Sequence, residues 1–395
     1  MDLAAEPTVA RHENPLVRLD PRPYTLAARD LERLLSPALV VYLDAARENL
    51  RRVIARAGSP DRLRPHVKTI KTPALFAELA AAGIRHFKCA TLREARCLLE
   101  TLRSLGLEDI DLLVAYPLVE PALSGLGALA RAHPRARLSV LCEEPARVAE
   151  VPRELGIFLD VDPGMRRTGV PLSDRATLRA LARAAGERLR GIHHYEGHLH
   201  GESTERRALC FAGYRELLDV VADLERAGAK IGELVTSGTP AFLHALAFPG
   251  FRELAGTVHR VSPGTVVLHD LRTAEENPEL ELLPAALVLA RVVSRPAKDL
   301  VTCDAGSKSI AAEAGDPCAA ALGRPELLAL RPSEEHLPLC VLAGPAPARG
   351  DVLMLVPRHV CPTVNLAEEA VLVEGGRVRS SVPVSARAHD LWVNG

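Results

Sequence analysis

Lysine is rare in this chain, and one lysine stands in a sequence context that suits chemistry. Of the 49 basic residues, 43 are arginine and only 6 are lysine. Only a lysine can lose its proton near neutral pH and attack a carbonyl group to form a Schiff base. Lys68 ends the run Arg64-Pro65-His66-Val67-Lys68-Thr69, where a barrel strand would present it to a ligand. Taken alone, the stretch also fits an ordinary lysine at a strand end.

Two short loops rich in glycine, serine and threonine follow later apolar runs. One loop contains Ser237, Gly238 and Thr239, and the other contains Gly264 and Thr265. Backbone N–H groups of such loops hold phosphate, and in barrels phosphate often lies after strands seven and eight. Each loop alone also fits plain turn chemistry. Together with Lys68 across the barrel, they indicate a phosphorylated aldehyde cofactor.

Alternating strand and helix patterns must position these residues. Eight short apolar runs, each followed by a helical pattern, predict a (β/α)8 barrel. They lie near Leu63–Thr69, His86–Thr91, Asp111–Tyr116, Leu138–Glu143, Ile157–Asp162, Gly191–Glu196, Glu233–Ser237 and Val258–Ser262. A doubly wound open sheet is the alternative, but no G-x-G-x-x-G motif opens a helix.

The pattern of apolar and polar residues changes at about residue 266, where helical patterns end and β-type runs separated by turns begin. The sequence therefore predicts an α/β protein with a second, mostly β domain at its C-terminal side. We expect an N-terminal arm and strand over 1–43 that joins the β domain, a barrel over 44–265 and the β domain over 266–395.

Composition excludes several classes of protein. The chain is 48% hydrophobic and has a net charge of −1, without a basic stripe, which argues against nucleic acid as the main partner. No apolar run approaches the roughly 20 residues of a membrane helix, and no signal peptide is evident. The 8 cysteines are scattered without a C-x-x-C motif. We therefore expect reduced thiols in a cytoplasmic protein.

Several motifs together resemble a known family. The chain is similar to fold-type III pyridoxal-phosphate (PLP) enzymes of the alanine racemase-like type, and more narrowly to D-threonine aldolases and D-serine dehydratases. The matching pieces run in the family's order: Arg64–Thr69, Cys89-Ala90-Thr91-Leu92-Arg93-Glu94-Ala95, Asp162–Gly169, Tyr195-Glu196-Gly197-His198, Ser333-Glu334-Glu335-His336 and Pro357–Asn365. They cover most of the chain.

The resemblance implies a role for each matching residue. Lys68 would hold PLP covalently, Arg167 would approach the phenolic side of the cofactor ring, and Tyr195 would lie near it. The phosphate would be bound by Ser237, Gly238, Thr239, Gly264 and Thr265. His359 and Cys361 would bind a divalent metal beside the substrate. The family also implies a homodimer, for which the run Cys303–Lys308 is our candidate contact, although that run also fits an ordinary β-turn.

The metal pair has partial support from the residues themselves. On a strand, His359 and Cys361 would point to the same face, and a Cys/His pair favours zinc over magnesium or manganese. A buried core histidine and a small buried thiol would explain the same residues. Among relatives, His-x-Cys resembles the zinc-dependent dehydratases, whereas aldolases more often carry His-x-Asp. A further departure is Ile70, where the family usually has a histidine.

These parts imply a PLP-dependent lyase that acts on a β-hydroxy D-amino acid. D-serine dehydratase-type chemistry, which yields pyruvate and ammonia, is placed slightly ahead of retro-aldol cleavage of the D-threonine aldolase type. Lys68, once released, or His198 would act as the base, although His198 also fits a residue that closes a turn.

An amino-acid racemase would need a second base and no metal pair. A non-catalytic PLP carrier would keep Lys68 but would not need His359 and Cys361. The sequence does not name the substrate, the second base or the partner of the pyridine nitrogen.

Overall fold

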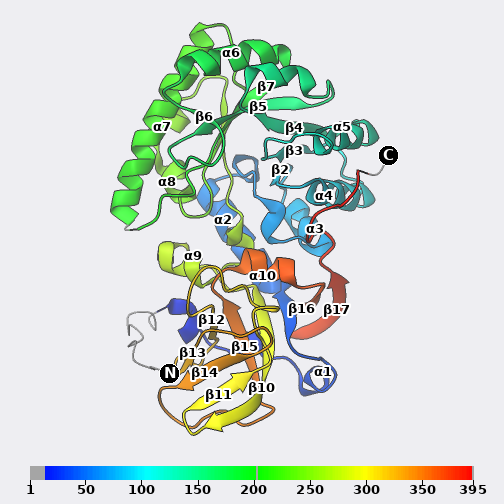
Figure 1. Ribbon diagram of the computed structural model, residues 1–395, viewed down its shortest axis with the longest axis vertical. Coiled ribbons are helices and arrows are strands. Elements are labelled where there is room, and N and C mark those ends of the chain that lie inside the picture. Colours follow the sequence, from blue (N-terminus) through cyan, green and yellow to red (C-terminus); the bar gives the residue numbers. More distant parts are fainter. Residues whose placement is uncertain (1–13, 202, 394–395) are drawn as a thin grey trace. The chain divides into compact units, whose positions relative to one another are not determined.

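The computed structural model describes residues 14–201 and 203–393, which form two compact units (Figure 1). One unit contains residues 14–49 and 267–384, and the other contains residues 50–266 and 385–393. Helix α2 (Leu43–Ala57) begins in the first unit and ends in the second.

The second unit contains the parallel barrel predicted from the sequence. Its strands are ordered β2, β3, β4, β5, β7, β8 and β9, and the short β6 pairs with β5. Leu63 forms a bridge to Val261 of β9, and His66 forms one to Lys88 of β2, so that segment 63–66 joins both edges of the sheet. This closure confirms the (β/α)8 barrel. The strands are β2 (His86–Cys89), β3 (Asp111–Val114), β4 (Arg137–Cys142), β5 (Gly156–Asp162), β6 (Val170–Pro171), β7 (Leu189–His194), β8 (Glu233–Thr236) and β9 (Val258–Val261).

Three of the barrel helices, α3, α4 and α6, begin at side-chain caps that the sequence supplies. Thr72, Thr91 and Asp174 each accept a backbone N–H bond from the third residue after them. Glu94 also accepts the N–H of Ala90 at 2.7 Å, so the Cys89–Ala95 motif acts locally as a helix start. The helices are α3 (Pro73–Ala81), α4 (Leu92–Ser104), α5 (Ala122–Ala132), α6 (Arg175–Ala185), α7 (Ser203–Arg226) and α8 (Phe242–Ala247).

The amino end of the barrel is held by a buried arginine. The side chain of Arg64 is 0% exposed, and it donates to both carboxylate oxygens of Glu233, at 2.8 and 2.7 Å. It also donates to Asp111 Oδ1 at 2.8 Å. Above this layer, Leu113, Leu141, Phe158 and Val235 form an apolar cluster. One guanidinium group thus links the closing segment 63–66 to strands β3 and β8.

The first unit is mostly β, as predicted. Its nine-stranded sheet has the order β13, β14, β11, β10, β1, β16 and β17, and β15 pairs with β10 and β12. Strand β1 pairs antiparallel with β10 and parallel with β16. The strands are β1 (Ala38–Tyr42), β10 (Ala286–Ala297), β11 (Leu300–Cys303), β12 (Ala319–Ala321), β13 (Leu327–Ala329), β14 (Leu337–Val341), β15 (Val352–Pro357), β16 (Glu369–Glu374) and β17 (Arg377–Pro383), and the helices are α1 (Ala28–Leu31), α9 (Leu271–Glu276) and α10 (Val360–Leu366).

The last described residues, 385–393, belong to the barrel unit, although their sequence texture grouped them with the β domain. Arg93 Nε donates to the carbonyl oxygen of Ser385 at 2.9 Å. Arg96 forms an ion pair with Asp390 at 2.8 Å. The helix motif that starts α4 therefore also anchors the end of the chain.

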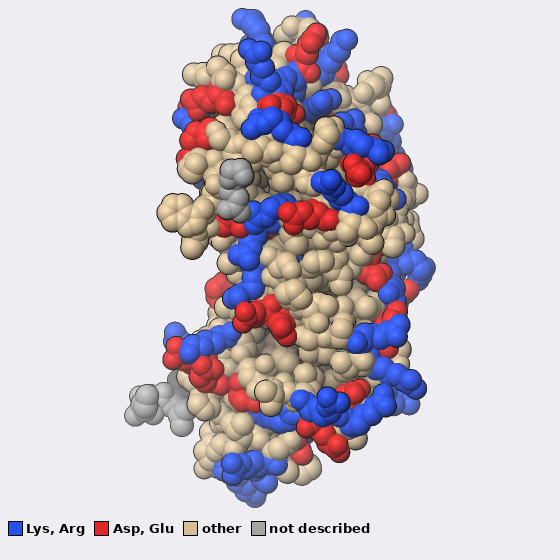
Figure 2. Space-filling view, turned by 90° about the vertical axis from the view of Figure 1, so that its right-hand side faces the viewer, with Lys and Arg blue, Asp and Glu red and all other residues tan. Residues whose placement is uncertain are grey.

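The surface is mixed in charge. Figure 2 shows basic and acidic side chains interspersed over one face of the molecule. Within the described residues, no helix is long and apolar enough to cross a membrane.

We predict that Glu233→Ala destabilises the protein by about 3–5 kcal/mol, because it leaves the Arg64 guanidinium buried and short of its main partner. Urea unfolding followed by circular dichroism measures the change. Asp109→Asn is the matched control: it removes an ion pair with Arg135 in which both side chains are exposed, so the unfolding midpoint should stay where it is. An unchanged midpoint for Glu233→Ala would contradict the anchoring role of Arg64.

The free energy of unfolding should depend on pH through the ion pair of Arg64 with Asp111. Burial opposes ionisation of Asp111, but Arg64 outweighs it and holds the pKa of this carboxyl below its ordinary value. In the unfolded chain the pKa of an aspartate is about 3.9, and the lower pKa of Asp111 in the folded protein stabilises the fold at any pH above that value. This stabilisation is lost as the pH falls through the pKa of Asp111 in the folded protein.

Candidate active site

Lys68 lies where the barrel closes, but it does not end a regular strand. After the bridge at His66, the chain enters a 3-10 turn over Val67–Thr69. The N–H of Lys68 donates to Nδ1 of His66 at 3.4 Å, so the His66 side chain caps this turn. The predicted strand over Leu63–Thr69 is therefore too long, because the cap turns the backbone away from the extended path. The half-buried Lys68 side chain stands at the carboxyl end of the bridged segment.

Arg167 and Tyr195, two predicted cofactor residues, are brought together. The guanidinium carbon of Arg167 lies 4.7 Å from the centre of the Tyr195 ring. Nζ of Lys88, from β2, lies 5.6 Å from the same ring. Cations over an aromatic face are attracted by its negative quadrupole. The ring of Tyr195 is thus placed by two cations.

The two expected phosphate loops contact each other. The hydroxyl of Thr239 accepts the N–H groups of Gly264 and Thr265, both at 3.1 Å. Ser237 adopts a positive φ of 64°, and its buried Oγ has no partner among the described residues. A Cβ on Gly238 would lie only 2.7 Å from the Tyr195 ring, so glycine is required there. The unpartnered hydroxyl and the space kept by glycine fit an anionic group.

The Gly264 loop also reaches the turn that carries Lys68. A Cβ on Gly264 would lie 3.0 Å from Oγ1 of Thr69 and 3.2 Å from the carbonyl oxygen of His66. These two residues flank Lys68 closely in the chain. The expected Schiff-base lysine and one expected phosphate loop therefore share one end of the barrel, and together they fit PLP.

Glu196 positions one of these loops from the outer side of the barrel. Its buried carboxylate accepts the Ser237 N–H at 3.2 Å and the Tyr214 hydroxyl, and it bonds Nδ1 of His194 at 3.2 Å. Burial raises the pKa of Glu196, but the bonds from His194 and Tyr214 outweigh burial and lower it. The motif Tyr195-Glu196-Gly197-His198 already contained this carboxylate, although we gave Glu196 no role.

Two buried residues that sequence reasoning missed lie on neighbouring strands. Asp160 of β5 and His193 of β7 are paired in register, and Oδ1 of Asp160 bonds Nδ1 of His193 at 2.8 Å. The bond and charge of Asp160 favour protonation, but burial lowers the pKa of His193. The predicted base His198 is half-buried beside Gly164, and its Nδ1 has no partner among the described residues.

Cations outnumber free carboxylates at this end of the barrel. Within the described residues, no carboxylate lies within ion-pair distance of Lys68, Lys88 or Arg167, whereas the nearby Lys71 pairs with Glu94 at 2.6 Å. Burial, followed by the charge of Lys68, lowers the pKa of Lys88 to about 7. Such a group of cations favours anionic ligands.

The expected metal pair lies in the other unit, and its local structure differs from the prediction. Strand β15 ends at Pro357, His359 caps α10, and Cys361 stands in the first turn of that helix. The strand geometry assumed for the pair was wrong, because the N–H of Val360 bonds Asp270 Oδ2 at 2.9 Å and starts a helix there.

The pair still makes side-chain contact in this helical geometry. His359 hydrogen bonds to Cys361, and its Nδ1 bonds the Glu313 carboxylate. Burial opposes its charge, but these contacts raise the pKa of His359 to about 9. No group of three His, Cys, Asp or Glu side chains arranged for a metal occurs in the part of the chain that the structure describes. The nitrogen and sulfur donors fit zinc, with two protein ligands.

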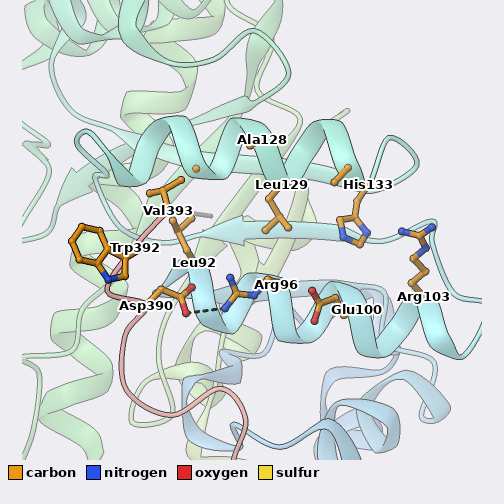
Figure 3. A pocket seen from close by; sticks show the side chains of 12 residues that line it. Leu92, Arg96, Glu100, Arg103, Ala128, Leu129, His133, Asp390, Trp392 and Val393 are labelled. Atoms are coloured by element: carbon orange, nitrogen blue, oxygen red, sulfur yellow. Dashed lines mark hydrogen bonds and ion pairs between the residues drawn. The ribbon is translucent and has the colours of Figure 1, made fainter. Parts of the chain in front are cut away.

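A separate cavity of about 440 Å³ lies between α4, α5 and the C-terminal tail (Figure 3). Arg96 is paired with Asp390 at its edge, and Trp392 is largely exposed. None of the predicted site residues lines this cavity. It lacks the amine and the loops described above, so we place the candidate site at the barrel end instead.

Comparisons with known proteins show which family the chain belongs to. Residues 41–269 match the family "Alanine racemase, N-terminal domain", and residues 285–373 match "Putative serine dehydratase domain". The chain is 33% identical to a D-threonine aldolase from Arthrobacter sp, over 90% of this chain and 94% of the relative. A solved D-threonine aldolase from Filomicrobium marinum is 28% identical, with a TM-score of 0.78, and the match covers 89% of this chain and 95% of that one.

A second kind of relative is a dehydratase. The D-threo-3-hydroxyaspartate dehydratase from Delftia sp. HT23 has a TM-score of 0.72 at 25% identity, covering 91% of this chain and 99% of that one. A histidine variant and a cysteine variant of D-threo-3-hydroxyaspartate dehydratase have been solved, the cysteine variant in the metal-free form. The two substituted positions are two residues apart, as His359 and Cys361 are here.

The barrel, the lysine at its closure and these matches lead to one conclusion. The chain belongs to the alanine racemase-like, fold-type III family of PLP-dependent enzymes, and it is a lyase.

Proposed function

We propose that this enzyme is a PLP- and metal-dependent lyase for a β-hydroxy D-amino acid. The observation that carries the proposal is the placement of Lys68, an amine without a carboxylate partner among the described residues, beside the Gly264 loop. Relatives named for D-threonine and for 3-hydroxy-D-aspartate support the substrate class, since both are β-hydroxy D-amino acids.

Each residue at the barrel end has a task in this proposal. Bound PLP supplies an electron sink for the bonds at Cα of the substrate. Lys68 holds the cofactor through its amine, and Arg167 and Tyr195 flank it. The loops at Ser237–Thr239 and Gly264–Thr265 bind its phosphate, with the Ser237 hydroxyl as an unused donor. Lys68 after its release, or His198, takes the substrate proton.

We predict that borohydride reduction in the presence of PLP attaches the cofactor to the peptide that contains Lys68. Lys68→Ala should abolish both the visible absorbance of the bound cofactor and the label, because no other amine has this position. Peptide mass spectrometry locates the label, and Lys230→Ala, an exposed lysine, is the matched control. A label on Lys71, Lys88 or Lys308 would overturn the assignment.

The metal proposal rests on His359 and Cys361. Their side chains already make contact, and their spacing equals that of the histidine and cysteine substituted in the dehydratase structures. A site with two protein ligands leaves positions open for substrate oxygens, which suits a catalytic zinc. The thiolate favours zinc over harder cations.

We predict one zinc per chain, which a chelator removes because only two protein ligands hold it. Cys361→Ala should lower the metal content at least tenfold, as measured by plasma mass spectrometry. Cys340→Ala, which changes another partly exposed cysteine of the same unit, should retain the metal. Borohydride labelling of Lys68 should survive in both variants. Full metal content in Cys361→Ala would remove this residue from the site.

We infer that this enzyme catalyses dehydration faster than retro-aldol cleavage, because its His-x-Cys spacing matches that of the residues substituted in the dehydratase variants. The alternative, retro-aldol cleavage, is favoured by a different observation: the relative at 33% identity over 90% of this chain is a D-threonine aldolase. Both reactions need the same cofactor residues and differ in which substrate proton is removed, the one on Cα or the one on the β-hydroxyl group.

Product analysis separates these two reactions. We predict that D-serine yields pyruvate and ammonia faster than D-threonine yields glycine and acetaldehyde. Chelation of the metal should slow the first reaction by about 10²-fold or more, because hydroxide is a poor leaving group without a Lewis acid. Undiminished turnover in the metal-free enzyme would argue against the metal proposal. Faster release of glycine would establish the aldolase alternative.

We further propose that the enzyme is a homodimer, as in the family it resembles. The run Cys303–Lys308 is the assigned contact. Its backbone is fixed by a bond from the Ser307 N–H to the carbonyl oxygen of Ser333 at 2.9 Å, and exposed Lys308 pairs with Glu334 and Glu335. The run thus presents an ordered, charged surface.

A further inference from the structure

A second lysine occupies the inside of the barrel. Lys88 stands in register with Leu113, a member of the apolar cluster inside the barrel, and residues paired in a parallel sheet point to the same face. Lys88 is only 2% exposed. Its N–H bonds the carbonyl oxygen of Pro65 at 3.0 Å, in the segment that leads to Lys68. The backbone of Lys88 therefore lies beside the segment that leads to Lys68, and its Nζ lies 5.6 Å from the centre of the Tyr195 ring.

Lys88 differs from an ordinary buried lysine in having no acidic partner within residues 14–201 and 203–393. Lys71 is similarly buried and pairs with Glu94 at 2.6 Å. For Lys88 the contact within the described residues is the Tyr195 ring, which can hold a cation but cannot accept its proton. Burying an unpaired ammonium group is costly, so the free amine is favoured.

The groups whose charge or ring acts on Lys88 come from several elements and are mostly basic. They are Arg64, His66 and Lys68 from the closing segment, Arg167 from the loop after β5, and His193, Tyr195 and Glu196 from β7 and its end. Glu196 is the one whose charge favours protonation of Lys88, and its carboxylate is already engaged with Tyr214 and Ser237. Lys68 supplies the strongest opposing charge.

We propose that Lys88 accepts the proton that the Lys68 amine must lose before it bonds to the cofactor aldehyde, and returns that proton when Lys68 is released. The proposal rests on the proposed role of Lys68. In the forward step an N–H bond of the Lys68 ammonium group breaks, and its electron pair stays on Lys68. The lone pair of Lys88 forms the new N–H bond, so no redox partner is needed.

Electrostatics explains why Lys88 can be a free amine. Burial and the positive charge of Lys68 both disfavour the ammonium form of Lys88. Lysines next to other cations are activated in this way. Burial and Lys68 place the pKa of Lys88 at about 7, so that Lys88 can accept a proton above this pH and cannot below it.

The first test uses the full-length chain freed of cofactor. Trace acetylation over a range of pH, quantified by peptide mass spectrometry, reports the free-amine fraction of each lysine. Lys88 should reach half of its maximal labelling near pH 7, and the exposed Lys230 near the ordinary lysine value of about 10.4. Labelling of Lys88 with the same pH dependence as Lys230 would refute the proposal without any use of PLP.

The second test measures how fast PLP becomes linked to Lys68, by stopping samples with borohydride. Lys88→Met should slow this rate at least tenfold at pH 7 and move the rise of rate with pH upward. Lys88→Arg should be equally slow, because a permanent cation cannot accept a proton. Imidazole in the buffer should restore the rate of Lys88→Ala, whereas Lys230→Met should match the unchanged protein.

The outcomes separate the two proposals. If PLP is linked to Lys68 at the wild-type rate in folded Lys88→Met, the proton-acceptor role is wrong while the PLP assignment stands. If reduction labels a residue other than Lys68, the proposed function fails. If Lys88→Met does not fold, the pH profile of acetylation and the imidazole rescue of Lys88→Ala still test whether Lys88 is the proton acceptor.

Discussion

The closure of the barrel by segment 63–66 is the constraint on which the rest of the site depends. Arg64 is fully buried and binds Glu233 on β8 and Asp111 on β3, so the amino end of this segment cannot shift. Bridges at Leu63 and His66 fix its register against β9 and β2. Four residues beyond Arg64, the chain presents Lys68. A structural ion network at one end of the barrel thereby positions an amine at the other end.

Charge organises the two ends in opposite ways. At the amino end the buried guanidinium of Arg64 is matched by two carboxylates, which makes a neutralised, structural layer. At the carboxyl end Lys68, Lys88 and Arg167 are not matched by carboxylates of the described residues. Lys88 is buried and Lys68 half-buried, whereas Arg167 is exposed, and an unpaired buried cation destabilises a fold unless a ligand binds it. The imbalance thus favours an anionic cofactor and substrate over a purely structural role.

Much of this could be predicted from sequence, because periodicity reports burial and burial dictates the barrel. The strands that follow Lys68 were placed within two residues at each end, since each is a short apolar run between turns. The helix that carries Cys361 was missed, because His359–Leu366 contains too few residues to show a helical period and its start depends on distant Asp270. Lys88 was overlooked for a similar reason: the Tyr195 ring that its amine contacts is distant in the chain and comes close only in the folded barrel.

The two phosphate-type loops show how the site is prepared before a ligand arrives. Backbone N–H groups enclosed by protein need partners, and the Thr239 hydroxyl meets this need for Gly264 and Thr265. One side chain thus links the loops after β8 and β9 at a fixed distance. The strained backbone of Ser237 persists because Glu196 holds its N–H, which leaves the Ser237 hydroxyl buried and unused. Because these bonds already exist, little ordering entropy remains to be lost when an anion binds.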